Sequence, residues 1–226
     1  MNTIKEKWEI LHAQSRFRPK YPDESVLRFI FCNFKRDGSE KVLDLGCGGG
    51  RHTILMANEG IIPYGIDISE EGVRNTKELL INNGYECFAN NVTCDNFESL
   101  PYENEFFQGI FAYGTLYYGG SKVYTKAISE MYRTLVKGGA CLAVVRGHKD
   151  YRYGQGREVE PNTFVIDVKD DNASALAEAG MTMHFFTEDE LREAFSAFCQ
   201  VSIDTVAFSR MNGKYLNFDY LVTAIK

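Results

Sequence analysis

Short apolar segments alternate with longer amphipathic segments between residues 41 and 146, and this alternation constrains the fold more than any other feature. The predicted strands are KVLDLG (41–46), IIPYGIDIS (61–69), YECFANNV (85–92), FFQGIFAYG (106–114) and ACLAVVRG (140–147). The predicted helices between them are RHTILMANEG (51–60), EEGVRNTKELLINNG (70–84) and SKVYTKAISEMYRTLVKGG (121–139). Alternation at this spacing predicts a mostly parallel sheet with helices on both faces.

The flanking segments complete a single predicted domain over residues 1–226. Residues 1–38 hold two predicted helices, TIKEKWEILHAQ and PDESVLRFIFCNF, and form a helical cap. Residues 147–186 are polar and lack a long periodic run. Because a long loop inside a compact domain usually has a function, this segment is predicted to be a lid or substrate-binding insertion.

The C-terminal part of the chain carries two local signals. Thr187 and Glu190 match a capping box, which predicts that a helix begins in TEDELREAF. The segments QVSIDTVAFSR and MNGKYLNFDYLVTAIK are predicted strands, joined by a turn around Asn212 and Gly213. A hairpin is therefore expected at the end of the parallel sheet.

The composition narrows the class of protein. The formal charge of −6 argues against a large basic surface for nucleic acid or for an anionic membrane. None of the six cysteines forms a C-x-x-C pair, so no metal site is expected and a reduced, cytoplasmic protein is predicted. No segment is apolar over a membrane-spanning length, and the N-terminus lacks the apolar core of a signal peptide.

The stretch VLDLGCGGGR, residues 42–51, joins the first predicted strand to a helix. Glycines let a ligand approach the main chain, and the free N–H groups of the helix start favour polar ligands there. Asp67 ends the next predicted strand, where a carboxylate can accept both hydroxyls of a ribose. The dinucleotide pattern G-x-G-x-x-G fails at Arg51, and Asp44 would repel a pyrophosphate but suits an ammonium group. The loop therefore predicts a ligand that contains a ribose and an amino group.

With these residues the chain resembles the class I S-adenosylmethionine-dependent methyltransferases, in the small-molecule branch often labelled type 11 or type 12. The resemblance runs from Trp8 to Lys226 and includes the glycine loop, GIDIS, DNFESLPYENEFFQGIFAYGTLYY and MYRTLVKGGACLAVVRG. It implies a Rossmann-like seven-stranded sheet in the order 3-2-1-4-5-7-6 with an antiparallel last strand. It also implies S-adenosylmethionine as cofactor, S-adenosylhomocysteine as product, and in-line methyl transfer to a small polar or aromatic molecule.

The resemblance also implies cofactor-binding residues. The acid and the glycine loop would hold the methionine part, which assigns Asp44, Gly46, Cys47, Gly48 and Gly50. Asp67 would bind the ribose, and Ile68 would stack on the adenine. Asp95 would take the adenine amino group, with Asn90 or Asn91 as alternatives, and Asn96 would lie beside the ring. Tyr113 would lie near the sulfonium.

The acceptor side is less defined by the sequence. The residues predicted to contact the substrate are Tyr117, Tyr118, Arg146, Tyr151 and His184. Either tyrosine could instead be core packing, Arg146 could pair with an acid, and His184 could pack below the last helix. His148 and Tyr113 are the candidate general bases. His52 is expected to be structural, and Trp8 is expected to anchor the first helix.

Three other functions compete with small-molecule methylation. An RNA or protein methyltransferase needs an extended recognition surface, and only SRFRPK suggests one. A cofactor-binding protein without catalysis is the second, and a nicotinamide-dependent oxidoreductase, disfavoured by Arg51, is the third. The identity of the small-molecule acceptor and the choice between monomer and homodimer stay open.

Overall fold

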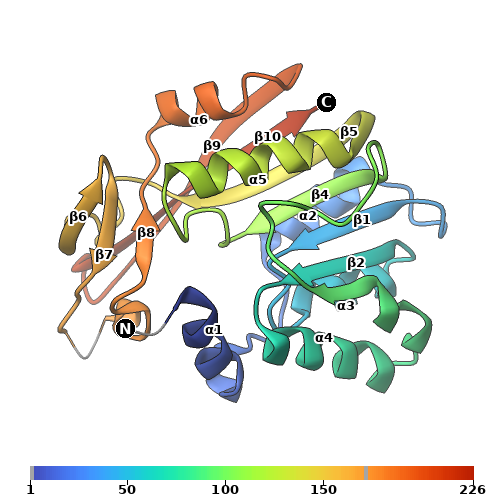
Figure 1. The fold of residues 1–226 in the computed structure, drawn as a ribbon, viewed down its shortest axis with the longest axis horizontal. Coiled ribbons are helices and arrows are strands. Elements are labelled where there is room, and N and C mark those ends of the chain that lie inside the picture. Colours follow the sequence, from blue (N-terminus) through green and yellow to red (C-terminus); the bar gives the residue numbers. More distant parts are fainter. Residues whose placement is uncertain (1–2, 171–172) are drawn as a thin grey trace.

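A seven-stranded sheet forms the centre of the protein (Figure 1). The computed structural model describes residues 3–170 and 173–226. The strands follow the order β3-β2-β1-β4-β5-β10-β9. Neighbours from β3 to β5 pair in parallel, and β10 is antiparallel to both β5 and β9. Since β10 and β9 are the seventh and sixth strands of the expected order 3-2-1-4-5-7-6, the predicted topology is confirmed.

Helices cover both faces of this sheet. Buried residues of α2 and α3 pack against Val42 and Phe111 on one face, whereas those of α5 and α6 join the cluster around Leu43 and Phe107 on the other. The strands are β1 (Lys41–Leu45), β2 (Ile62–Asp67), β3 (Val92–Cys94), β4 (Phe107–Tyr113), β5 (Leu135–Arg146), β9 (Gln200–Arg210) and β10 (Tyr215–Ile225). The α-helices are α1 (Ile4–His12), α2 (Glu24–Asn33), α3 (Arg51–Asn58), α4 (Glu70–Asn82), α5 (Ser121–Thr134) and α6 (Glu188–Ala194). None of the helices in the described ranges combines the length and apolar character of a membrane span.

Side-chain caps define where several of these helices begin. Thr187 and Glu190 form the predicted capping box at α6, and Thr3 and Glu6 form another at α1. The Ser69 hydroxyl accepts a hydrogen bond from Gly72 N at the start of α4. These local signals explain why helix starts are predicted well from the sequence.

Residues 85–92 differ from the expected strand. A 3₁₀ helix, η2 (Glu86–Asn91), precedes the short strand β3. Tyr85 and Phe88 are stacked and pack together near Leu80 of α4. Residues three apart share a side of a 3₁₀ helix but lie on opposite faces of a strand, so this packing favours the helix.

The helix predicted over residues 121–139 is also shorter than expected. α5 ends at Thr134, and Leu135 has extended backbone angles that begin β5. The pairing of β5 with β4 is irregular between Phe107 and Gly109, and Gly138 has a φ of 75°. A positive φ of this size does not continue a right-handed helix, which places the last glycines in the strand.

Residues 147–186 are more ordered than the polar sequence suggests. They contain a second sheet, with the order β6-β7-β8, formed by β6 (Gly156–Glu160), β7 (Thr163–Ile166) and β8 (Thr182–His184). A short 3₁₀ helix, η3 (Ser174–Glu178), precedes β8, and another, η1 (Ser15–Phe17), follows α1. Isolated bridges join Tyr118 to Met183 and Gly147 to Phe186, so the small sheet is tied to the end of the large one.

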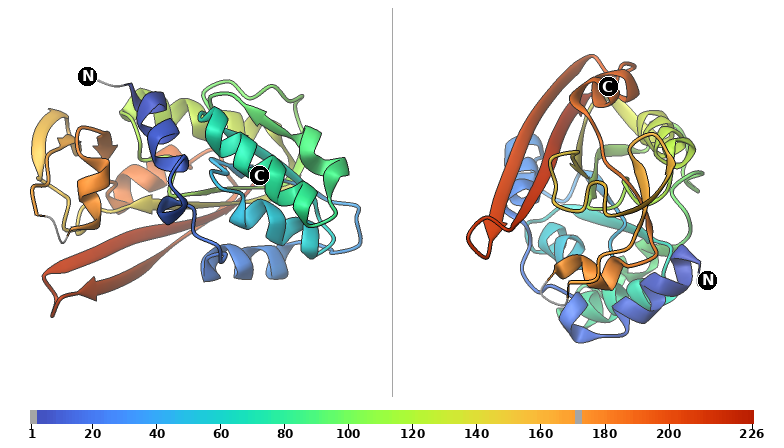
Figure 2. Two further views of the ribbon diagram at one scale, coloured as in Figure 1. Left: turned by 90° about the horizontal axis from the view of Figure 1, so that it is seen from below. Right: turned by 90° about the vertical axis from the view of Figure 1, so that its left-hand side faces the viewer.

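The first helix, α1, lies between α4 and the small sheet in Figure 1 and in the left view of Figure 2. Its Glu9 carboxylate accepts hydrogen bonds from the Ser69 hydroxyl and from the backbone N–H groups of Glu70 and Glu71. Partial burial opposes ionisation, but these donors together lower the pKa of Glu9. A carboxylate at a helix N-terminus satisfies free N–H groups and interacts favourably with the helix dipole. Glu9 therefore anchors α1 to the start of α4.

We expect Glu9→Ala to lower the free energy of unfolding by about 1–2 kcal/mol, because the start of α4 loses its external acceptor. The same change should speed proteolysis between α1 and α2. Urea denaturation and limited proteolysis measure the two effects. The control is Glu78→Ala, which removes an exposed ion pair with Arg74 on α4 and should change stability by less than about 1 kcal/mol. Equal effects of both substitutions would contradict the anchoring role.

Candidate functional site

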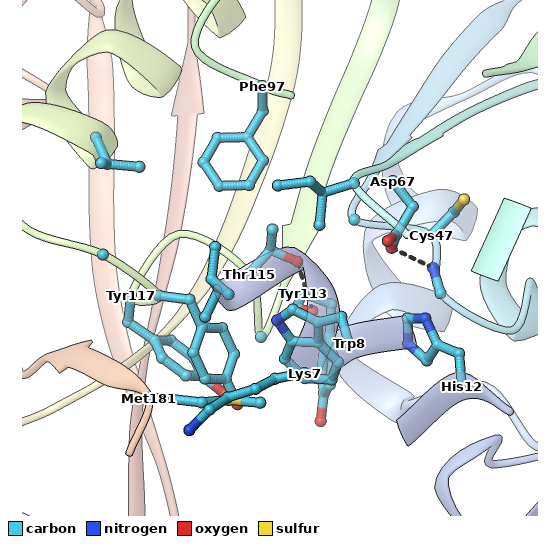
Figure 3. Close-up of a pocket in the computed structure, with 18 of the residues that line it drawn as sticks. Lys7, Trp8, His12, Cys47, Asp67, Phe97, Tyr113, Thr115, Tyr117 and Met181 are labelled. Carbon is cyan, nitrogen blue, oxygen red and sulfur yellow. Dashed lines mark hydrogen bonds between the residues drawn. The ribbon is translucent and has the colours of Figure 1, made fainter. Parts of the chain in front are cut away.

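A cavity of about 730 Å³ opens at the carboxyl ends of β1, β2 and β4. Its walls come from α1, the glycine loop, the end of β2, the segment after β4 and the segment before β8. Side chains from distant parts of the chain converge there (Figure 3). The carboxyl edge of a parallel sheet is the expected ligand-binding position in this class of fold.

The glycine loop forms one end of the cavity, and Gly46, Cys47, Gly48 and Gly49 line it. Gly46 has a φ of 83°, and a Cβ there would stand 2.1 Å from Thr115 Oγ1. Gly50 does not line the cavity; it caps α3 in the left-handed conformation, and a Cβ there would lie 2.9 Å from the Thr76 side chain. The loop is bare because neighbouring side chains already fill the space beside it.

Asp67 lines the same end of the cavity and holds the loop in place. Its Oδ2 accepts a hydrogen bond from Gly48 N at 2.8 Å, and its Oδ1 accepts one from Ser69 N at 2.9 Å. The residue is only 8% exposed. Burial raises the pKa of Asp67, while the nearby His12 side chain opposes that rise. Each oxygen is thus oriented by a backbone donor, and the carboxylate faces the cavity beside His12.

Asp44 lies beneath the loop instead of in the cavity wall. It is 1% exposed, and its Oδ2 accepts a hydrogen bond from Thr53 Oγ1 at 2.8 Å. Burial raises the pKa of Asp44 to about 7, although the hydrogen bond from Thr53 opposes that shift. Contact between Asp44 and a ligand is therefore not part of this geometry, whereas an electrostatic effect through the loop is.

Ile68, Asn96, Phe97 and Glu98 form the wall next to Asp67. Asp95 is exposed and outside the lining, and its Oδ1 accepts a hydrogen bond from Asn96 N. The two alternatives to Asp95 also lie outside the lining, and Asn91 Nδ2 donates to Pro63 O. Asp95 thus lies outside the cavity lining in this structure, whereas Phe97, which sequence analysis did not single out, is part of it.

Tyr113 lines the cavity at the end of β4. Its hydroxyl donates a hydrogen bond to Asp23 Oδ2 at 2.8 Å. Burial and the neighbouring Asp23 raise the pKa of the Tyr113 phenol well above its usual value. A phenol that keeps its proton at neutral pH is a poor general base, so the geometry favours a binding role over proton abstraction.

Tyr117 and Tyr118 line the cavity, and in Figure 3 Tyr117 lies at the end away from Cys47 of the glycine loop. The Tyr117 hydroxyl accepts a hydrogen bond from Arg146 Nη2 at 3.2 Å, and the Tyr118 hydroxyl donates one to Glu178 Oε1 at 2.7 Å. Trp8 packs edge-on against Tyr118 with ring centroids 5.0 Å apart. The hydroxyl groups are held by the protein, and the aromatic rings remain to form the wall.

Comparisons with known proteins agree with this geometry. A family profile described as a methyltransferase domain matches residues 42–139. A ubiquinone biosynthesis O-methyltransferase from Haemophilus ducreyi is 43% identical over 60 residues, which is 26% of this chain and 25% of that protein. Residues 42–139 thus resemble a methyltransferase domain, and the strand order of the sheet is the one expected for the class I S-adenosylmethionine-dependent methyltransferases.

Several solved structures share the fold of this chain. An S-adenosylmethionine-dependent methyltransferase from Methanosarcina mazei superposes with a TM-score of 0.68 at 23% identity, over 88% of this chain and 96% of that one. Phosphoethanolamine N-methyltransferase 2 from Haemonchus contortus, in complex with S-adenosyl-L-methionine, superposes with a TM-score of 0.70 at 14% identity, over 100% of this chain and 60% of that one. A 1,6-didemethyltoxoflavin-N1-methyltransferase from Burkholderia thailandensis superposes with a TM-score of 0.58 at 20% identity, over 98% of this chain and 77% of that one.

Four of the residues expected near the acceptor lie outside the cavity lining. Arg146 is buried in ion pairs with Asp150 and Asp219, so the alternative of pairing with an acid holds, and it reaches the cavity only through Tyr117. His148 Nδ1 lies 3.3 Å from Phe186 O, and the Tyr151 hydroxyl accepts a hydrogen bond from Ala175 N. His184 is 2% exposed and its Nδ1 lies 2.7 Å from Thr163 Oγ1. The small sheet, which the polar sequence did not predict, accounts for the position of His184, which lies on β8 and contacts Thr163 of β7.

Several lining residues were not predicted as site residues from the sequence. They are Lys7, His12, Phe97, Thr115 and Met181. Trp8 lines the cavity as well as packing the first helix. Trp8 and His12 are four residues apart and therefore lie on one side of α1, a spacing that sequence analysis could have used but did not. His52, which was expected to be structural, is buried, accepts a hydrogen bond at Nε2 from Asp23 N, and also lines the cavity.

The structure contains no group of three or more His, Cys, Asp or Glu residues that could hold a metal ion in the described ranges 3–170 and 173–226.

The buried Asp44 predicts a specific pH dependence of stability. The folded pKa of about 7 lies above the unfolded value of about 4. The folded state therefore binds the proton more tightly, and stability falls as the pH rises from about 4 to about 7. Asp44→Asn keeps an acceptor for Thr53 and removes this loss. In urea denaturation, the free energy of unfolding of the variant relative to that of the wild type should increase by about 2–3 kcal/mol between pH 5 and pH 8. Parallel curves for the two proteins would show that Asp44 is ionised throughout.

Proposed function

We propose that this chain transfers a methyl group from S-adenosylmethionine to a small polar or aromatic molecule. The observation that carries the proposal is one continuous cavity, which extends from Asp67 and the glycine loop to the aromatic side chains of Trp8, Tyr117 and Tyr118. The chain matches only a quarter of the curated relative's length, so its activity and acceptor rest on this cavity. α1 and the segment before β8 wall the cavity, which favours a compact acceptor over a macromolecule.

The residues at the loop end fit the cofactor. Gly48 presents bare main chain to the cavity, and Asp67 presents a carboxylate whose remaining lone pairs can accept two ribose hydroxyls. Ile68 and Phe97 supply apolar surface for the adenine, and Asn96 lies beside them. When bound, S-adenosylmethionine supplies a methyl group already activated by the positive sulfur.

The protein's task is then to orient the acceptor and to exclude water. Alignment of reacting groups can lower a barrier by about 7–11 kcal/mol, whereas a general base adds about 10²–10⁴-fold in rate. Tyr117 and Tyr118 are held rigidly by Arg146 and Glu178, which suits a positioning wall. We propose that α1 and residues 147–186 together close this space during the reaction. The six unpaired cysteines support a reducing, cytoplasmic compartment as part of the proposal.

Calorimetric titration with S-adenosylhomocysteine tests the cofactor half of the proposal. The wild type should bind it and should not bind NADH. Asp67→Ala should weaken binding at least about 10-fold, or about 1.4 kcal/mol, because the ribose loses its acceptor. The matched control is Asp95→Ala, which removes an exposed carboxylate outside the cavity and should change affinity less than about twofold. Circular dichroism checks that both variants are folded. Absence of binding by the wild type, or an unaffected Asp67→Ala variant, would overturn the assignment.

Incubation with methyl-labelled S-adenosylmethionine and a cell extract tests the acceptor half. The extract is separated into small molecules, RNA and protein before the reaction. Label should appear in the small-molecule fraction. Label only in RNA or protein would favour a macromolecular methyltransferase. S-adenosylhomocysteine binding without transfer to any fraction would favour a non-catalytic binding protein.

A further inference from the structure

The helix α1 contributes two different environments to the cavity. His12 lies at the glycine loop, because a Cβ on Gly48 would stand 3.3 Å from His12 Nε2. Lys7 is five residues earlier, which is about 7.5 Å along the helix axis. Its ammonium donates a hydrogen bond to Ala179 O at 2.6 Å. In Figure 3, His12 lies on the side of Asp67 and Cys47, whereas Lys7 extends toward Met181 and Tyr117. Lys7 thus belongs to the end of the cavity that is remote from the loop.

The ammonium of Lys7 has unused hydrogen-bonding capacity. An ammonium group has three donors, and the backbone carbonyl of Ala179 takes one. Lys7 forms no ion pair with any residue of the described ranges. Burial lowers the pKa of Lys7, so the charge is partly removed from water without a carboxylate in compensation.

The surrounding chain accommodates this charge instead of neutralising it. Gly180 has a φ of 75°, and a Cβ there would stand 2.6 Å from Lys7 Nζ. Glu178 precedes Ala179, the residue whose carbonyl Lys7 contacts. Its carboxylate is already paired with Arg152 at 2.7 Å and accepts a hydrogen bond from the Tyr118 hydroxyl. The glycine therefore leaves room for the ammonium, while the nearby carboxylate is committed elsewhere.

The charges of the cavity wall are distributed unevenly. Arg157 lines the cavity together with Lys7, and a third cation of the lining, Arg51, lies at the glycine-loop end, where α3 begins. The acids in the lining are Asp67, at the glycine loop, and Glu98, which pairs with Lys126 at 3.1 Å. Trp8, Tyr117 and Tyr118 provide the aromatic surface beside Lys7. The remote end is therefore cationic and aromatic, and no lining acid among the described residues offsets Lys7 there.

We propose that the methyl acceptor is an aromatic molecule with an anionic substituent, carboxylate or phosphate, and that Lys7 binds this substituent at the remote end of the cavity. The inference rests on the proposed function, because it assigns the acceptor to the space left beside the cofactor. An anion would satisfy the free donors of Lys7, and stacking on aromatic side chains would hold the ring. Lys7 is in this account a specificity-determining residue.

The test measures binding to the protein saturated with S-adenosylhomocysteine. The probes are benzoate, 2-naphthoate and phenyl phosphate, with benzamide and 2-naphthamide as neutral partners. The wild type should bind at least one anionic probe at least 10-fold more tightly than the neutral partners, and the preferred anion distinguishes carboxylate from phosphate. Lys7→Met should abolish that preference, and Lys7→Arg should retain most of it. The control is Lys5→Met, at a second lysine of α1. It removes a partly exposed ion pair with Glu70 of α4 and should leave the preference for the anionic probe intact.

The outcomes separate this inference from the proposed function. Equal binding of anionic and neutral probes by the wild type would overturn the inference while S-adenosylhomocysteine binding stands. If Lys7→Met weakened the binding of anionic and neutral probes equally, the contact of Lys7 with Ala179 would serve only to hold α1 in place, and the inference would be overturned. Weaker binding of S-adenosylhomocysteine by Lys7→Met would assign Lys7 to the cofactor's own carboxylate and would also overturn the inference. Failure of the wild type to bind S-adenosylhomocysteine would instead remove the proposed function.

Discussion

The Asp67 carboxylate is the point on which the rest of the site depends. One oxygen holds the N–H of Gly48 and the other holds the N–H of Ser69, so a single side chain joins the glycine loop, the end of β2 and the start of α4. A carboxylate buried to this degree is costly unless it is hydrogen-bonded. The two backbone donors offset that cost and fix the direction of both oxygens. The group that shapes the loop is therefore also a group that lines the cavity.

The N-terminal helix completes the cavity. Glu9 binds the exposed N–H groups of α4, Asn75 Nδ2 donates to His12 O, and Lys7 reaches the segment before β8. α1 thus connects the cofactor half of the sheet to the small sheet through hydrogen bonds at both ends. The cavity has two chemically distinct ends because this one helix places His12 beside an acid and Lys7 beside aromatic rings. α1 in this way contributes side chains to both ends of the cavity.

The parts of the fold that could be predicted are those with local signals. Caps at Ser69 and Thr187, glycines after β1 and the alternation of strands and helices depend on neighbours in sequence, and the expected strand order follows from them together with the family resemblance. The acceptor side could not be predicted in the same way, because its residues are placed by long-range packing. Arg146 and His184 have positions in the sequence that are compatible with an acceptor site. In the folded chain, however, Arg146 pairs with buried acids and His184 packs within the small sheet. Lys7 and Phe97 carry no motif, and only the folded chain brings them to one cavity.

A crystal structure of the protein with S-adenosylhomocysteine would test the account most directly. The account predicts that the ribose hydroxyls lie about 2.6–3.2 Å from the Asp67 carboxylate oxygens, with the adenine against Ile68 and Phe97. It also predicts that the space beside Trp8, Tyr117 and Tyr118 stays free for the acceptor. A ligand whose ribose makes no contact with Asp67, or whose density fills the aromatic end instead, would contradict it.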